Sequence, residues 1–183
     1  ITSNFDANIG QQFGGDNLTF EVNSGITYNR QGHNTLDTDK KANLTIIVNS
    51  GSTLSAHKTS LDRNRAIKAD ESQNLTITNS GSIWADLSNA IRLQKTDGLQ
   101  ITNNSGGEIY ASKVAISDEA LATTNPTITN SGKIYITGTE NAVKLTGSSG
   151  ATVTNNAGGE IYNSGGTGAV IYLGSSSTLT NSG

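Results

Sequence analysis

Apolar and polar residues alternate in short runs along most of the chain, and the runs recur at a nearly constant interval. Between residues 75 and 85, Leu75, Ile77, Ile83 and Ala85 alternate with threonines and a tryptophan. A period of two is the pattern of a strand with one buried face. No segment keeps its apolar residues at the 3.6-residue spacing of an amphipathic helix. The pattern therefore predicts an all-β protein made of short strands.

A Thr-Asn-Ser-Gly phrase, followed by an isoleucine and an aromatic residue, marks each copy of the pattern. The isoleucines stand at positions 83, 109, 134 and 161, with steps of 26, 25 and 27 residues. Looser copies precede them at 17–28 and 43–56, and a shorter copy closes the chain at 178–183. A third alternating run that begins with alanine, such as residues 90–93, ends each repeat. A fixed period in this range indicates a solenoid.

Three short strands per period predict a parallel β-helix with about 25–27 residues per coil. Leucine-rich repeats share this period. They are disfavoured because the Leu-x-x-Leu-x-Leu core and any helical segment are missing. We expect a single domain over residues 1–183, regular over 74–183 and less regular, with loop insertions, over 1–73.

The Asn-Ser-Gly phrase falls where the chain must turn from the first strand of a coil to the second. Glycine and asparagine tolerate positive φ most readily, and each coil must repeat the turn directly above the last. Stacked asparagine amides can also hydrogen-bond to one another along the axis. Two extra residues follow Asn103 and Asn155 but not Asn130. The corner is therefore expected to bulge on alternate coils.

Composition narrows the possible functions. Charged residues make up 15% of the chain, against about 25% in an average domain. The net charge of −3 argues against a nucleic-acid partner. The absence of cysteine excludes disulfides, thiolate catalysis and cysteine metal sites. The sequence has no apolar run of about 18 residues, so direct membrane insertion of this chain is not expected.

The phrase x-Thr-Ile-Thr-Asn-Ser-Gly-x-Ile, followed by Asn-Ala-Ile or Asn-Ala-Val, resembles the passenger region of Gram-negative bacterial autotransporters of the pertactin and diffuse-adhesin type. The resemblance covers essentially the whole chain and is strongest over residues 74–183. It implies a right-handed β-helix that is exported through the outer membrane and displayed outside the cell as part of a longer, processed polypeptide. Such passengers include adhesins, proteases, esterases and toxins, so the resemblance leaves the activity open.

Outward residues of successive coils are expected to form columns, because equivalent strands lie about 4.8 Å apart. The aromatic column holds Trp84, Tyr110, Tyr135 and Tyr162. It is a candidate platform for sugar rings or for a partner's apolar side chains. Alternatively, the rings only stabilise the sheet, by roughly 0.5–1.5 kcal/mol per stacked pair.

Outward residues of the third strand in each coil are expected to form a second, mainly basic column. It holds Lys68, Arg92, Ser117 and Lys144. A basic stripe would suit an anionic partner such as an acidic polysaccharide, although solvated side chains that splay apart are the alternative. Beside the aromatic column, Glu108, Lys133 and Glu160 alternate in sign, which we interpret as structural.

Paired threonines on the first strand form a further array, in which Gln100 interrupts one row. Such rows resemble ice-binding solenoids, but threonine is also a good strand residue. The early strands are expected to carry an extra residue, over 18–22 and 44–48, which would break the regularity of the array.

Catalysis has little support, because the acidic residues are scattered along the chain. His33 and His57 are interpreted as loop residues of the charged segments 29–42 and 56–65, and we expect no catalytic residues, metal or cofactor. The sequence thus favours an adhesion or binding scaffold for a host-cell surface protein or glycan, or for self-association between cells. A polysaccharide lyase or hydrolase and a purely structural stalk remain the alternatives.

Overall fold

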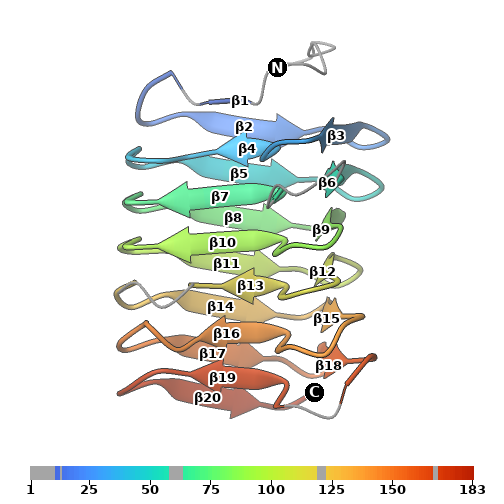
Figure 1. The fold of residues 1–183 in the computed structure, drawn as a ribbon, viewed down its shortest axis with the longest axis vertical. Helices are drawn as coiled ribbons and strands as arrows, with labels where there is room; N and C mark the ends of the chain where they lie inside the picture. The colour runs from blue at the N-terminus through green and yellow to red at the C-terminus, as the bar shows by residue number, and fades with distance from the viewer. Residues whose placement is uncertain (1–10, 13, 58–63, 119–122, 167–168) are drawn as a thin grey trace.

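The computed structural model describes residues 11–12, 14–57, 64–118, 123–166 and 169–183. These residues form a right-handed solenoid with three strands per coil, as the sequence predicted. Figure 1 shows the strands of successive coils stacked along the long axis, with the first coils at one end and the last at the other. Among the described residues no helix is long and apolar enough to cross a membrane.

Three parallel sheets run along the axis, and each takes one strand from every coil. Sheet A consists of β1 (Gln11–Gln12), β4 (Leu36–Asp37), β7 (Ile67–Asp70), β10 (Ile91–Gln94), β13 (Ile116–Ser117), β16 (Val143–Leu145) and β19 (Ile171–Leu173). Sheet B consists of β2 (Thr19–Val22), β5 (Thr45–Val48), β8 (Thr76–Asn79), β11 (Gln100–Asn103), β14 (Thr127–Asn130), β17 (Thr152–Asn155) and β20 (Thr178–Asn181). Sheet C consists of β3 (Thr27–Gln31), β6 (Thr53–His57), β9 (Ser82–Ala85), β12 (Glu108–Ala111), β15 (Lys133–Ile136) and β18 (Glu160–Asn163).

The core is a set of aliphatic columns between the three sheets. On sheet B, Ile77 pairs with Ile101, Ile101 with Ile128 and Ile128 with Val153. All four side chains are at most 1% exposed, which confirms the inward register. Alternation in the sequence thus places every second strand residue in the core and leaves its neighbours on the surface.

The corner between sheets B and C carries the predicted asparagine ladder. Asn79 donates to Asn103, Asn103 to Asn130, Asn130 to Asn155 and Asn155 to Asn181, over steps of 24, 27, 25 and 26 residues. The first four asparagines also donate to the carbonyl oxygen of a glycine at their own corner. Buried amides are therefore satisfied coil after coil, as backbone groups are in a sheet.

The bulges on alternate coils are also present. The longer corners after Asn103 and Asn155 contain Gly106 and Gly158, with φ of 79° and 80°. This conformation favours glycine, because a side chain there is strained. The shorter corner after Asn130 has no such residue. The two extra residues therefore form an outward turn on every second coil of this region.

A second column of corner residues, between sheets A and B, was not predicted. One equivalent position in each coil is left-handed there: Asn17, Asn43, Asn74, Gly98, Asn125, Gly150 and Ser176, with φ from 49° to 67°. In three of these corners the residue three positions earlier is left-handed as well, namely Lys40, Glu71 and Lys95. Asn74 donates to Asn43, and Asn43 donates to Asn17, at 2.9 and 3.0 Å. A Cβ atom on Gly98 would lie 2.6 Å from Oδ1 of Asn74, which explains the glycine.

Two expectations for the early coils were wrong. Strands β2 and β5 have four residues each and pair in the common register, with Thr19 opposite Thr45 and Thr45 opposite Thr76. One threonine row therefore continues into these coils, whereas Glu21 and Ile47 interrupt the other row. Residues 29–42 are not one loop, because they include the end of β3 and all of β4, with Leu36 fully buried. In the other expected loop, residues 58–63 lie outside the described part of the chain.

Candidate functional site

The aromatic column lies on the outer face of sheet C, as predicted. Trp84, Tyr110, Tyr135 and Tyr162 occupy equivalent positions of β9, β12, β15 and β18. Their ring centroids are 5.7, 4.9 and 5.0 Å apart, and successive rings are inclined by only 9°, 7° and 1°. The four side chains thus form one continuous stack, which follows from parallel strands repeating at almost the same distance.

This stacking changes what the column can offer to a ligand. The rings cover one another's faces, so Tyr110 and Tyr135 have no open face on which a sugar ring could lie. At the early end of the stack, the ring of His57 meets Trp84 at 4.4 Å and 87°. The faces of the inner rings are therefore not available to a sugar ring, and the binding role of the column stays a prediction. What remains accessible on these half-buried residues is the ring edges and the phenol hydroxyls.

The phenols of Tyr110 and Tyr135 are neutral hydrogen-bonding groups at physiological pH. Burial, together with the neighbouring Glu108, which accepts a hydrogen bond from its hydroxyl, raises the pKa of Tyr135 to about 12. Burial also raises the pKa of Tyr110, as does the charge of Glu108. Both hydroxyls are therefore protonated and able to donate and accept hydrogen bonds.

A row of charged residues lies beside the phenols on the same face. Glu108 pairs in register with Lys133, and Lys133 with Glu160, so the predicted alternation of sign is confirmed. The ammonium of Lys133 lies 3.8 Å from Oε1 of Glu160, with both side chains about half exposed (46% and 55%). An ion pair this exposed contributes little to stability and leaves its atoms accessible to a ligand.

His57, on the coil before Trp84, contacts residues at the early end of this surface. Its Nδ1 atom lies 2.6 Å from Oδ2 of Asp86, two residues after Trp84. The sequence interpretation placed His57 in a loop, whereas it is the last residue of β6 and contacts the aromatic stack. Within the described ranges of the chain, no group of three or more histidine or acidic side chains is placed so that it could hold a metal ion.

The predicted basic column is in register on sheet A but is surrounded by acids. Lys68 pairs in register with Arg92. Its ammonium contacts the carboxylate of Asp39 and lies 3.5 and 3.4 Å from those of Asp37 and Asp70. Arg92 also lies 3.5 Å from Asp70. This end of the column is therefore neutralised by the protein itself.

Burial shifts the titration of these acids. It raises the pKa of Asp37, with a further rise from the adjacent Asp39, and it raises the pKa of Asp70 against the opposing effect of Arg92. For Lys68, burial alone would lower the pKa, but the hydrogen bond to Asp39 and the nearby carboxylates raise it overall.

At the other end of the basic column, Lys144 also lies near an acidic side chain. Lys144 lies 3.9 Å from Glu140, and Ser117, between Arg92 and Lys144, is only 2% exposed. An unbroken, unpaired basic stripe is therefore absent from the described part of sheet A. The role of Lys68, Arg92 and Lys144 in anion binding stays a prediction that this geometry does not favour.

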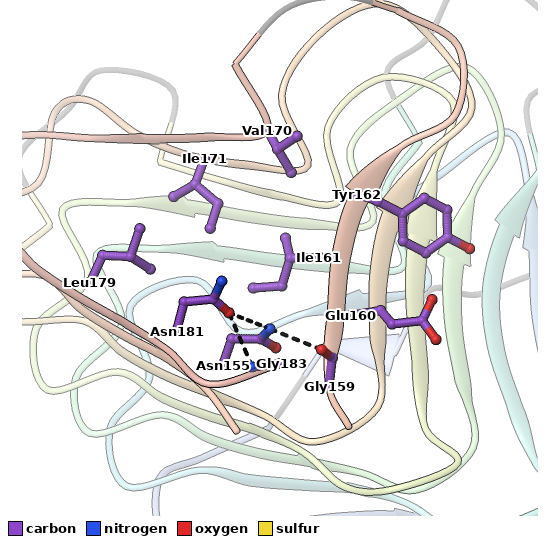
Figure 2. A pocket seen from close by; sticks show the side chains of 10 residues that line it. All are labelled: Asn155, Gly159, Glu160, Ile161, Tyr162, Val170, Ile171, Leu179, Asn181 and Gly183. Atoms are coloured by element: carbon purple, nitrogen blue, oxygen red, sulfur yellow. Dashed lines mark hydrogen bonds between the residues drawn. The ribbon is translucent and has the colours of Figure 1, made fainter. Parts of the chain in front are cut away.

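The last coil ends in a cavity of about 570 Å³. Figure 2 shows inward side chains of the last coils around it, with Tyr162 and Glu160 on the sheet C side. It is lined by Asn155, Gly159, Glu160, Ile161, Tyr162, Val170, Ile171, Leu179, Asn181 and Gly183. Leu179, which continues the buried column of Val153, is 49% exposed. This end of the solenoid therefore presents the core columns to solvent.

Comparisons with protein-family models, with curated proteins and with solved structures found no match. The repeated phrase and the geometry of sheet C are therefore the features that indicate a function.

Proposed function

We propose that the chain is a surface-displayed binding scaffold of the autotransporter passenger type, and that it acts as an adhesin for host-cell glycans. The observation that carries the proposal is the outer face of sheet C. There, phenol hydroxyls and alternating carboxylate and ammonium groups recur once per coil, in register along the axis. A surface that repeats at a constant interval suits a ligand that also repeats.

A polysaccharide has the chemistry that this face would recognise. Its hydroxyls both donate and accept, and they match the neutral phenols of Tyr110 and Tyr135 and the carboxylate of Glu108. The edges of the stacked rings supply apolar contact for the sugar C–H groups. Each contact is weak, but several sugars bound to successive coils act together through effective concentration.

Secretion belongs to the same proposal. Export through the outer membrane and display outside the bacterium are inferred from the repeated phrase, and the lack of cysteine is compatible with passage through a pore in the unfolded state. A host-cell protein, a second cell's copy of the same chain and a purely structural role are the alternatives that the experiment must separate.

The test is a glycan array probed with the 183-residue chain, alongside host cells with and without glycosidase treatment. The proposal predicts binding to a defined set of linear glycans and loss of cell binding after treatment. Cell binding that survives treatment would point to a protein partner, and no binding at all would favour a stalk. Shortened products after incubation with a bound glycan would instead support a polysaccharide lyase or hydrolase.

A further inference from the structure

A small recess lies beside the charged row of sheet C, at the corner with sheet B. It has a volume of about 120 Å³ and is lined by Ser105, Gly106, Gly107, Glu108, Ser131, Gly132, Lys133 and Gly158. We refer to it as the corner recess. The short corner at Ser131 and Gly132 supplies residues from the middle coil, while Gly106 and Gly158 come from the longer corners on either side.

The recess is a consequence of the alternating corner lengths. The longer corners are fixed relative to the short one by hydrogen bonds, because Asn156 donates to Ser131 at 2.9 Å and the backbone N–H of Ser131 donates to Asn103 at 2.7 Å. Nothing lies within 4 Å of a Cβ atom built on Gly106 or Gly158. The glycines therefore leave open space above a well-anchored short corner.

The size of the recess restricts its occupant. A water molecule takes up about 30 Å³ of liquid, so the recess has room for about four. Pockets for whole drug-sized ligands measure about 300–1,000 Å³. The corner recess can thus accept a pendant group of a few heavy atoms but not a complete sugar ring.

The groups at its edge restrict the chemistry further. Lys133 offers N–H donors, and Glu108 offers carboxylate acceptors, on neighbouring strands in register. The glycine residues contribute Cα surfaces against which a methyl group can pack. An acetamido group needs this set, because its carbonyl accepts, its N–H donates and its methyl is apolar.

We propose that the corner recess binds the acetamido group of an N-acetylhexosamine within an extended β-linked glycan. The proposal rests on the glycan-binding function and names the ligand class for the same face. Two coils span about 10 Å, close to the length of one disaccharide in an extended β-1,4-linked chain. Alternate sugars in such a chain face the same way, so their substituents recur at the interval of the alternating corners.

The test compares binding of chitopentaose, cellopentaose and deacetylated chitosan pentamer by isothermal titration calorimetry. Chitopentaose carries the acetamido groups, cellopentaose has hydroxyls in their place, and the chitosan pentamer has free amines. We expect chitopentaose to bind at least about tenfold more tightly than either of the others.

Two variants test whether the preference for chitopentaose arises at the corner recess. Ser105→Tyr should fill the recess from its exposed rim and lower chitopentaose affinity about tenfold. Ser24→Tyr is the matched control at the equivalent place of the first corner, far along the axis from the recess, and should bind as the wild type does. Lys133→Gln removes the charged donor without adding bulk, and should reduce the preference even if Ser105→Tyr folds poorly.

Each outcome decides a different point. Equal affinities for chitopentaose and cellopentaose, or a preference that survives both Ser105→Tyr and Lys133→Gln, would overturn the acetamido assignment while leaving glycan binding intact. Failure to bind any oligosaccharide, here and on the array, would overturn this inference together with the proposed function.

Discussion

The side-chain amide of Asn103 donates a hydrogen bond of 2.7 Å to the side-chain oxygen of Asn130, one coil further along. The same amide nitrogen also lies within hydrogen-bond distance of the carbonyl oxygens of Gly107 and Lys133. Both asparagines are fully buried. The ladder therefore joins successive corners through groups that water cannot reach, which couples the stability of each coil to its neighbours.

Replacing Asn130 with alanine should be strongly destabilising. The change leaves the amide of Asn103 without one partner and removes the donor to Asn155 and Glu160. A buried group left unpaired costs about 1–3 kcal/mol, so we expect a loss of about 2–4 kcal/mol in urea unfolding. Asn104→Ala, which removes a single partly buried bond to Ser80, is the control and should cost less than about 1.5 kcal/mol. Equal losses of unfolding free energy in the two variants would show that the buried asparagine ladder stabilises the fold no more than an ordinary corner hydrogen bond.

Two substitutions of Tyr110 distinguish the contribution of the stacked ring to stability from that of its hydroxyl. Tyr110→Ala removes the stacking contacts of Tyr110 with Trp84 and with Tyr135. At about 0.5–1.5 kcal/mol per stacked pair, the free energy of unfolding should fall by about 1–3 kcal/mol. Tyr110→Phe keeps the ring and should leave thermal unfolding almost unchanged. A large loss in the phenylalanine variant would mean that the hydroxyl, rather than the stack, supports the fold.

Asp37→Asn should stabilise the protein at neutral pH. Burial raises the pKa of Asp37 in the folded state, so this group favours folding below its unfolded pKa and loses that contribution as the pH rises through the folded value. The asparagine variant cannot ionise, so its advantage should be largest at about pH 7 and shrink as the pH falls toward about 4. A variant less stable than the wild type at neutral pH would show that attraction to Lys68 outweighs the burial.

The exposed end of the last coil should cause the 183-residue chain to associate. Leu179 is 49% exposed there, beside unpaired edges of the parallel sheets, which are ready to pair with another chain. Sedimentation over a concentration series should show a rising mass. Leu179→Lys should reduce the association, whereas Thr178→Lys, on the outward side of the same strand, should reduce it less. A chain that stays monomeric throughout would contradict this expectation.

The repeated pattern was sufficient to predict the fold and the register of its regular coils. Alternation and period are local properties, so the sequence alone assigns Ile77 and Ile101 to one buried column. The stacking of the corner asparagines could be predicted for the same reason, because the Asn-Ser-Gly phrase recurs once per coil. The column that contains Asn74, Gly98 and Ser176 was missed because its residue type changes from coil to coil, while only its backbone conformation is constant.

The sequence analysis missed one property of the aromatic column and one of the basic column. The covering of ring faces depends on side-chain torsions, which the sequence position of Tyr110 does not reveal. Two of the acids around Lys68, Asp37 and Asp39, come from the coil before it, across a step of 31 residues between Asp37 and Lys68 that is longer than the regular period. A sequence search that allowed for such a coil could have placed Asp37 beside Lys68.

The central claim is that the phenol hydroxyls of sheet C contact a glycan, and the double variant Tyr110→Phe, Tyr135→Phe tests it most directly. It keeps both rings of the stack and removes only the two hydroxyls. Affinity for the best-bound glycan of the array, measured by calorimetry, should fall about tenfold. The melting temperature of the same samples should fall only slightly, because the hydrogen bond from Tyr135 to Glu108 is lost while the stack is kept. Unaltered affinity in a folded double variant would contradict the claim and leave the stack as a structural element alone.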